Sequence, residues 1–289
     1  MIPPIAAEPI AYLGSFPITN ALVNAWIAVV FFVVACWFLK RRITAGLPGK
    51  FQNFAEAVVE FFLGYVDQVT HDRARSKRFL PLVGSFFIFI LFSNWLGQLP
   101  GTGSITVTAL VHGSIEKVPL LRPAASDLNL TLAMALLSVI VSHLLGIITI
   151  GFFKHWNRFF AVGNIINGFK KGGINIMVGL IEAMVGLIEF SAEIAKVLSL
   201  SLRLFGNIFA GEVLITVLYS LVAFILPLPF MGLELIVGVV QAMVFAMLSL
   251  VYLTILTEKP HGSEAEHKQD EIGEAHGTGH LHDRHPSLA

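Results

Sequence analysis

Five long apolar stretches divide the chain, and they lie at about residues 21–39, 79–99, 128–153, 174–226 and 231–256. Each is close to or above the roughly 20 apolar residues that a helix needs to cross a lipid bilayer. Charged residues gather between these stretches and at the ends of the chain. The pattern predicts an all-α integral membrane protein, with an N-terminal transmembrane helix, a transmembrane hairpin, and two long C-terminal helices that also form a hairpin.

The segment 51–69, between the first two stretches, has the period of an amphipathic helix. Glu56, Glu60 and Asp67 lie off its apolar face. This arrangement predicts a helix lying in the membrane interface. The apolar face consists of Phe51, Phe54, Ala55, Val58, Phe62, Tyr65 and Val69.

The fourth stretch is much longer than a membrane is thick. Its length of about 53 residues corresponds to roughly 80 Å of helix, whereas the hydrocarbon core is about 30 Å thick. It must break in two, tilt steeply, or do both. Because its interior contains neither a proline nor a polar loop, we favour one long, strongly tilted helix.

Composition supports a membrane protein. Hydrophobic residues make up 55% of the chain and charged residues 13%, against roughly 25% charged residues in soluble domains. The formal net charge is zero and no basic face stands out, which excludes a nucleic-acid partner. Cys36 is the single cysteine, so there is no disulfide framework. We expect no cofactor and no metal centre.

Lysines and arginines predict the orientation, because cytoplasmic loops are enriched in them. Residues 100–127 hold only two, and no residue before Lys40 is basic. We therefore expect residues 1–20 and the loop 100–127 to lie outside and the C-terminus inside. The basic residues of the two segments expected in the cytoplasm are Lys40, Arg41, Arg42, Lys50, Arg73, Arg75, Lys77 and Arg78, and then Lys154, Arg158, Lys170 and Lys171.

Three regions follow from this organisation. Residues 1–20 lack the features of a removed signal peptide and form an extracytoplasmic N-terminus, 21–257 form the membrane domain, and 258–289 form a cytoplasmic tail. The tail carries six of the ten histidines and few apolar residues, so we expect it to be disordered. A histidine-rich tract also binds metal ions weakly in some proteins, and that alternative stays open beside a plain solvated tail.

Polar residues of the fourth stretch recur at intervals that place them on one helical face. The last stretch also carries polar residues on one helical face, Glu234 and Gln241, which are seven residues apart. In an antiparallel hairpin that turns at Pro227–Pro229, Gln241 would lie opposite Arg203. The polar face consists of Glu182, Glu189, Glu193, Lys196, Ser199, Arg203 and Asn207.

Arg203 is the most informative residue of this face. An arginine at bilayer depth costs about 2.5–3.5 kcal/mol on insertion scales, and it is tolerated where it faces protein or water. Snorkelling to the interface is the alternative, although Arg203 lies about 25 residues from either end of its apolar stretch. Because its guanidinium does not release its proton, it suits a fixed barrier in a proton path, with a mobile carboxylate on another subunit to carry protons past it.

Glu212 and Glu234 are expected on the outer side of Arg203, in a shared site. Two carboxylates in one desolvated site do not both ionise cheaply, so we expect the pair to hold one proton and to relay protons. The alternative to a role of Glu182 and Glu189 in the proton path is that they lie at the water-exposed end of a tilted helix. The alternative for Asn207 and Gln241 is that they only form hydrogen bonds between helices.

The motif Ser199-Leu-Ser-Leu-Arg-Leu-Phe-Gly-Asn-Ile-Phe-Ala-Gly-Glu212 resembles the signature of subunit a of F-type ATP synthases. The resemblance covers about residues 15–257. Further landmarks of that family follow in the right order: Leu47–Asn53 (LPGKFQN), Asn94–Gly101 (NWLGQLPG), Pro123–Thr131 (PAASDLNLT), and Gln241–Phe245 (QAMVF) with Val251-Tyr-Leu253.

This resemblance implies a membrane stator of a rotary motor, in the inner membrane of a bacterium or in an organellar energy-coupling membrane. Its implied partners are a c-ring and the b subunits of the peripheral stalk. Arg203 would be the essential arginine facing each ring carboxylate. Glu189, Glu193 and Ser199 would belong to the cytoplasmic half-channel. The outer half-channel would use Asn207, Glu212, Glu234 and Gln241, with Asn94, Asp127 and Asn129 near its mouth.

Two features depart from the family. Many relatives carry a histidine and an acid where this chain has Glu212 and Glu234, and most end soon after the last helix. The main alternative function is a secondary transporter that binds an anionic substrate at Arg203. Such proteins usually contain internal repeats and interrupted helices, and no such duplication is visible here. A scaffold without conduction leaves the membrane charges unexplained.

Overall fold

The computed structural model describes residues 4–43, 49–99, 101–111, 114–160, 174–222 and 225–258. The predicted tail from residue 259 onward lies outside the described residues. The elements, in chain order, are β1 (Pro9–Leu13), β2 (Phe16–Thr19), α1 (Asn20–Arg42), α2 (Lys50–Thr70), α3 (Arg73–Gln98), η1 (Thr102–Ser104), β3 (Thr106–Val111), β4 (Ser114–Pro119), η2 (Ala124–Ser126), α4 (Leu128–Ile150), α5 (Phe152–Phe160), α7 (Ile174–Leu221) and α8 (Pro227–Thr257).

All five apolar stretches form helices long and apolar enough to cross a membrane, which confirms the predicted all-α membrane fold. The fourth stretch is one continuous helix, α7, of 48 residues. At 1.5 Å per residue it is about 72 Å long, so it lies at a strong tilt in a layer about 30 Å thick. Helix α8 begins at Pro227, where proline fits the first turn because no intrahelical partner is needed there.

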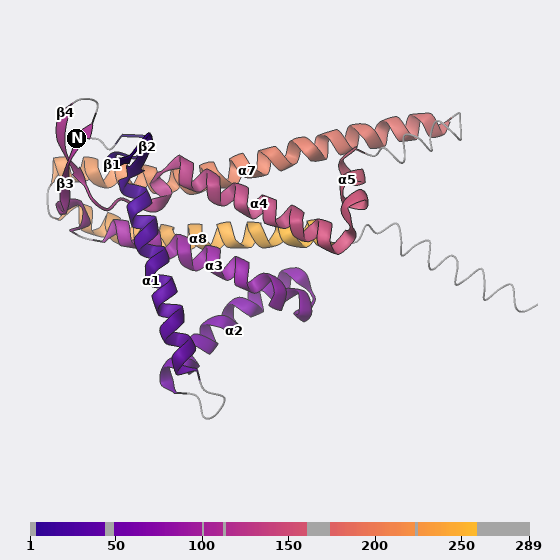
Figure 1. Cartoon of the computed structure of the whole chain (residues 1–289), viewed down its shortest axis with the longest axis horizontal. Helices are drawn as coiled ribbons and strands as arrows, with labels where there is room; N and C mark the ends of the chain where they lie inside the picture. Colours follow the sequence, from indigo (N-terminus) through magenta and orange to yellow (C-terminus); the bar gives the residue numbers. More distant parts are fainter. Residues whose placement is uncertain are drawn as a thin grey trace, which may run out of the picture.

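Helices α3, α4, α7 and α8 run alongside one another, and α1 crosses them at a steep angle (Figure 1). Helix α3 packs mainly on α8, and α4 packs on both α7 and α8. The shared core contains Phe86 of α3, Met134 of α4, Leu204 of α7 and Phe245 of α8. Leu200, Leu204 and Ile208 recur every four residues and are buried, so they fix which face of α7 turns inward.

Two short antiparallel hairpins lie at one end of the molecule, together with the end of α7 and the start of α8 (Figure 1). We call this the hairpin end, and the opposite end, where α5 follows α4, the α5 end. Apolar periodicity did not predict these strands, because β1–β2 and β3–β4 lie in segments taken only as the N-terminus and a loop. Strand β3 contacts β1, so the hairpins join the N-terminal segment to the 100–127 loop.

Helix α2 forms over the predicted amphipathic segment, and the face that it buries overlaps the predicted apolar face only in part. Phe62 and Val66 pack inward, whereas Phe51 and Phe54 of the predicted apolar face stay exposed. The inward face contacts α3 and α8. The exposed phenylalanines at the start of α2 remain available to the membrane interface.

The close approach of α3 to the loop before η2 depends on Gly97. A Cβ atom at Gly97 would lie 2.2 Å from the backbone nitrogen of Pro123 and 2.5 Å from its Cα. A backbone neighbour does not move aside as a flexible side chain does. The helix and the loop therefore meet at this distance only with glycine at position 97.

We expect Gly97→Ala to lower the free energy of unfolding by about 1–3 kcal/mol, the usual range for overpacking. The measurement is denaturant unfolding of the detergent-solubilised chain. Gly84→Ala is the matched control, because it lies in the same helix with nothing within 4 Å of the added Cβ, and it should leave stability unchanged or slightly raised. Equal stability of the two variants would contradict the packing argument.

Candidate functional site

Arg203 lies on the exposed side of α7, near the middle of the helix. Its neighbours Leu200 and Leu204 are buried against α3, α4 and α8, and this packing turns position 203 outward. Within the described part of the chain, Arg203 makes no hydrogen bond or ion pair. A permanent charge on a membrane helix therefore has no counter-charge in contact with it among the residues that the structure describes.

The surface around Arg203 is formed by small side chains. Ala195, Ser199, Gly206 and Ala210 are all exposed on the same side of α7. Small residues let a neighbouring helix approach closely in a membrane. Ser199 lies one turn before Arg203, as predicted, and contributes to this smooth surface.

Asn207 and Gln241 meet one turn beyond Arg203. The Asn207 amide nitrogen donates to Gln241 Oε1 at 2.8 Å. Gln241 is 4% exposed, and its own Nε2 has no hydrogen-bond partner among the described residues. The sequence predicted that Gln241 lies opposite Arg203. In the structure Gln241 contacts Asn207 instead, and this hydrogen bond joins α7 to α8.

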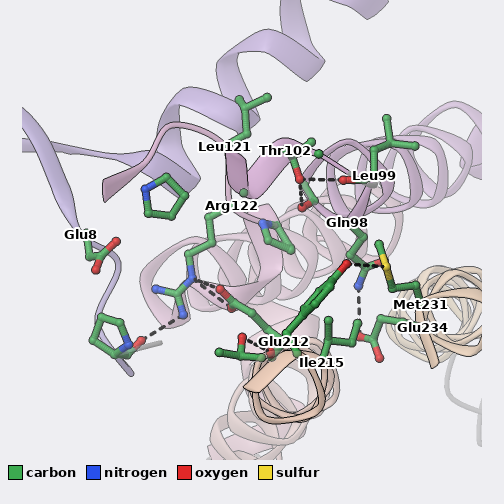
Figure 2. Close-up of a pocket in the computed structure, with 18 of the residues that line it drawn as sticks. Glu8, Gln98, Leu99, Thr102, Leu121, Arg122, Glu212, Ile215, Met231 and Glu234 are labelled. Atoms are coloured by element: carbon green, nitrogen blue, oxygen red, sulfur yellow. Dashed lines mark hydrogen bonds and ion pairs between the residues drawn. The ribbon is translucent and has the colours of Figure 1, made fainter. Parts of the chain in front are cut away.

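A cavity of about 570 Å³ lies at the hairpin end, between α7, α8, the end of α3 and the N-terminal segment. Figure 2 shows Glu212 of α7 and Glu234 of α8 at its wall, with Arg122 and Gln98 reaching toward them. The two predicted carboxylates thus line one cavity. Its other polar walls include Glu8, Lys117 and Thr216.

Glu212 is held by Arg122, which comes from the loop between β4 and η2. Arg122 Nε lies 2.8 Å from Glu212 Oε1 and 3.0 Å from Oε2. Arg122 is only 2% exposed and also donates to the carbonyl oxygens of Pro4 and Ala6. Its charge is therefore matched by one carboxylate and by the N-terminal backbone.

Glu234 has a different environment. Its Oε1 accepts a hydrogen bond from Gln98 Nε2 at 3.0 Å. The carboxyl group packs on the α7 backbone at Gly211, where an added Cβ would come within 1.9–2.1 Å of it. Within the described part of the chain, each acid has a hydrogen-bond partner of its own: Gln98 for Glu234 and Arg122 for Glu212. The expectation that the pair holds one proton stays a prediction.

Arg122 is the functional side chain that sequence reasoning missed, because it was counted only as one of two basic residues in the 100–127 loop. Its position directly before the Pro123–Thr131 landmark was the available signal. Gln98 was missed for a similar reason, although it lies inside the Asn94–Gly101 landmark.

Asn94, Asp127 and Asn129 have local structural contacts instead of positions on the cavity wall. Asn94 Oδ1 accepts from the Ala125 backbone nitrogen at 3.1 Å. Asp127 caps α4 by accepting from the Asn129 backbone nitrogen at 2.9 Å, and caps of this kind satisfy otherwise unpaired helix donors. Together these contacts shape the loop that carries Arg122.

Toward the α5 end, Glu193 is buried at 7% exposure. Lys196 donates to Glu193 Oε1 at 2.6 Å, and His143 of α4 lies 3.6 Å from Oε2. Glu189 is half-buried one turn before Glu193. The side chain of Glu182 lies outside the described residues.

Comparison with known proteins gives one consistent result. Residues 22–254 match the family model described as "ATP synthase A chain". The chain is 31% identical to ATP synthase subunit a of Moorella thermoacetica over 84% of its length and 93% of that protein. It is 35% identical to ATP synthase subunit a of Mycobacterium marinum, over 84% of this chain and 88% of the relative.

We expect the Arg122–Glu212 pair to be energetically coupled, because the two charges lie 2.8 Å apart and Arg122 is almost fully buried. A double-mutant cycle with Arg122→Gln and Glu212→Gln should give an interaction free energy of about 1–3 kcal/mol in unfolding measurements. Lys117→Gln is the control, since Lys117 lines the same cavity but is exposed. Additive effects of the two substitutions would contradict the pairing.

Proposed function

Because the chain belongs to the ATP synthase A chain family, we propose that it is the proton-conducting stator subunit in the membrane sector of a rotary ATP synthase. In this proposal it catalyses no chemical step itself. It offers two offset half-channels to a ring of c subunits, with Arg203 between them. The b subunits of the peripheral stalk hold it in place, and the surrounding bilayer covers its apolar faces.

One observation carries the proposal: Arg203 is exposed, is charged, and has no partner within the described residues. A guanidinium facing lipid alone costs about 2.5–3.5 kcal/mol or more. A carboxylate on a neighbouring membrane protein removes this cost, and the small residues around Arg203 leave room for its helix. A rotating ring supplies such carboxylates one after another.

The outer half-channel corresponds to the cavity at the hairpin end. Protons enter past Glu234 and Glu212 and then move along α7 past Asn207 and Gln241. Glu212 lies nine residues beyond Arg203, about 13 Å along the helix axis. A proton delivered at this level neutralises a ring carboxylate and lets it leave Arg203 for the lipid.

The inner half-channel uses Glu193 and Glu189, on the other side of Arg203. Glu193 lies ten residues before Arg203, about 15 Å along the axis. A ring carboxylate that returns protonated gives up its proton here. It then becomes an anion again and is attracted to Arg203, whose charge keeps protons from passing directly between the two half-channels.

The proposed orientation places the hairpin end outside and the α5 end in the cytoplasm, in the inner membrane of a bacterium or in an organellar energy-coupling membrane. Exposed Lys154 on α5 supports this choice, because basic residues favour the cytoplasmic side. A transporter with an anion site at Arg203 is less well supported, because Arg203 does not line the cavity.

We expect Arg203→Ala to abolish coupled ATP synthesis and to open a passive proton leak, because the barrier between the half-channels is removed. The measurements are ATP synthesis and proton permeability in vesicles that contain the purified complex. Arg75→Ala is the matched control, since Arg75 is a solvent-exposed arginine in a surface ion pair. Copurification with the ring shows that each variant assembles. Normal ATP synthesis by Arg203→Ala vesicles would refute the proposal.

Glu212→Gln combined with Glu234→Gln should reduce proton entry by at least about 100-fold, because glutamine does not exchange protons as a carboxyl group does. Proton uptake driven by an imposed potential measures this rate. Glu60→Gln, an acid on α2 away from the cavity, serves as control. Unchanged uptake in the double variant would rule out a relay through these two acids.

A further inference from the structure

Four ionisable side chains from three helices meet toward the α5 end. Glu193 and Lys196 come from α7, His143 from α4 and His155 from α5. The ring of Tyr252, on α8, lies 5.1 Å from Lys196 Nζ. The two histidines drew no attention in the sequence, because they lie within or beside the third apolar stretch.

The contacts in this cluster form an ordered chain. Glu193 Oε1 accepts a hydrogen bond from Lys196, while its Oε2 is buried with no hydrogen-bond partner among the described residues. His143 Nε2 is the ion-pairing nitrogen nearest that oxygen, at 3.6 Å. On the other side of the same ring, His143 Nδ1 lies 3.0 Å from His155 Nε2. The series carboxyl–imidazole–imidazole thus crosses from α7 to α5.

The packing holds this chain in place. His155 is 2% exposed and rests on Gly146 of α4, where an added Cβ would lie 2.8 Å from its Cε1 atom. Phe159 stands beside both imidazole rings, at 5.7 Å between centroids. By contrast, the side chain of His143 is 27% exposed, so its ring has room to turn.

A purely structural role does not account for all of this. Apolar residues would fill the space between the helices at lower cost than buried polar ones. Glu193 Oε2 faces the His143 ring, and the far nitrogen of that ring contacts the His155 ring. Proton transfer requires such a series of acid–base groups. Imidazole is suited to it, because it binds and releases protons near neutral pH.

We propose that His143 and His155 relay protons between Glu193 and the α5 surface, as the inner end of the conduction path. This inference rests on the proposed function. In the outward step to the cytoplasm, protonated Glu193 gives its proton to His143 Nε2 after the 3.6 Å gap closes or a water fills it. His143 passes its Nδ1 proton to His155 Nε2, and His155 releases one proton from its other nitrogen. The partly exposed His143 ring turns to restore its starting tautomer, and the buried His155 ring does so during a transient opening of its packing.

The test uses the intact complex in vesicles, with ATP synthesis driven by an imposed proton gradient. His143→Ala should slow synthesis at least about tenfold, since one acid–base group of the path is lost. Free imidazole at millimolar concentration should restore most of the rate, because the partly exposed site can admit it. His71→Asn is the matched control: its left-handed backbone suits asparagine, and imidazole should have no effect.

His143→Gln is the second variant if His143→Ala fails to assemble with the ring. Glutamine keeps hydrogen-bonding groups at this position but does not relay protons, so synthesis should again fall about tenfold or more. Unchanged synthesis in an assembled variant overturns the relay. Slow synthesis in assembled His143→Ala complexes that imidazole does not restore shows a structural role and also overturns it.

The Arg203→Ala vesicles, measured alongside, separate this inference from the proposed function. If they still make ATP, the proposed function fails. If they do not, while His143→Ala vesicles make ATP normally, the function stands and only the histidine relay is wrong.

Discussion

A permanent positive charge must be balanced inside a layer that has almost no capacity to solvate it, and the rest of this molecule is organised around that constraint. Helix α7 is held by its buried leucines so that Arg203 faces outward, flanked by small residues. Among the described residues, Arg122, Glu212 and Glu193 each contact an opposite charge, whereas Arg203 contacts none. In the proposed function, a neighbouring membrane protein supplies the opposite charge.

The remaining acids illustrate how different partners give chemically similar groups different roles. Glu212 is fixed by the Arg122 guanidinium, and Glu193 by Lys196. Glu234 has a neutral amide as partner and leans on a glycine backbone. An ion-paired carboxylate favours its charged form, whereas an acid among neutral groups exchanges protons more readily. The cavity thus contains one carboxyl group held by a guanidinium beside one held by a neutral amide.

Much of the helical architecture could be predicted from the sequence, because a membrane imposes a length and a polarity that few sequences satisfy by chance. The continuous α7 followed from the absence of proline, and Arg203 from its position in an apolar stretch. The periodicity of apolar residues does not predict contacts between segments that are far apart in the sequence. Arg122, Gln98, His143 and His155 acquire their roles only when loops and helices far apart in sequence are brought together. The short hairpins carry no long apolar pattern. Arg122, the partner of Glu212, had been assigned to a loop, and Gln98, the partner of Glu234, is at the end of an apolar stretch.

The contacts of Arg122 with the carbonyl oxygens of Pro4 and Ala6 make the start of the chain a wall of the cavity. The Arg122 guanidinium that binds Glu212 also donates hydrogen bonds to this N-terminal segment. Lengthening or shortening the N-terminal segment should therefore change the shape of this cavity, so purification tags are better placed at the opposite terminus.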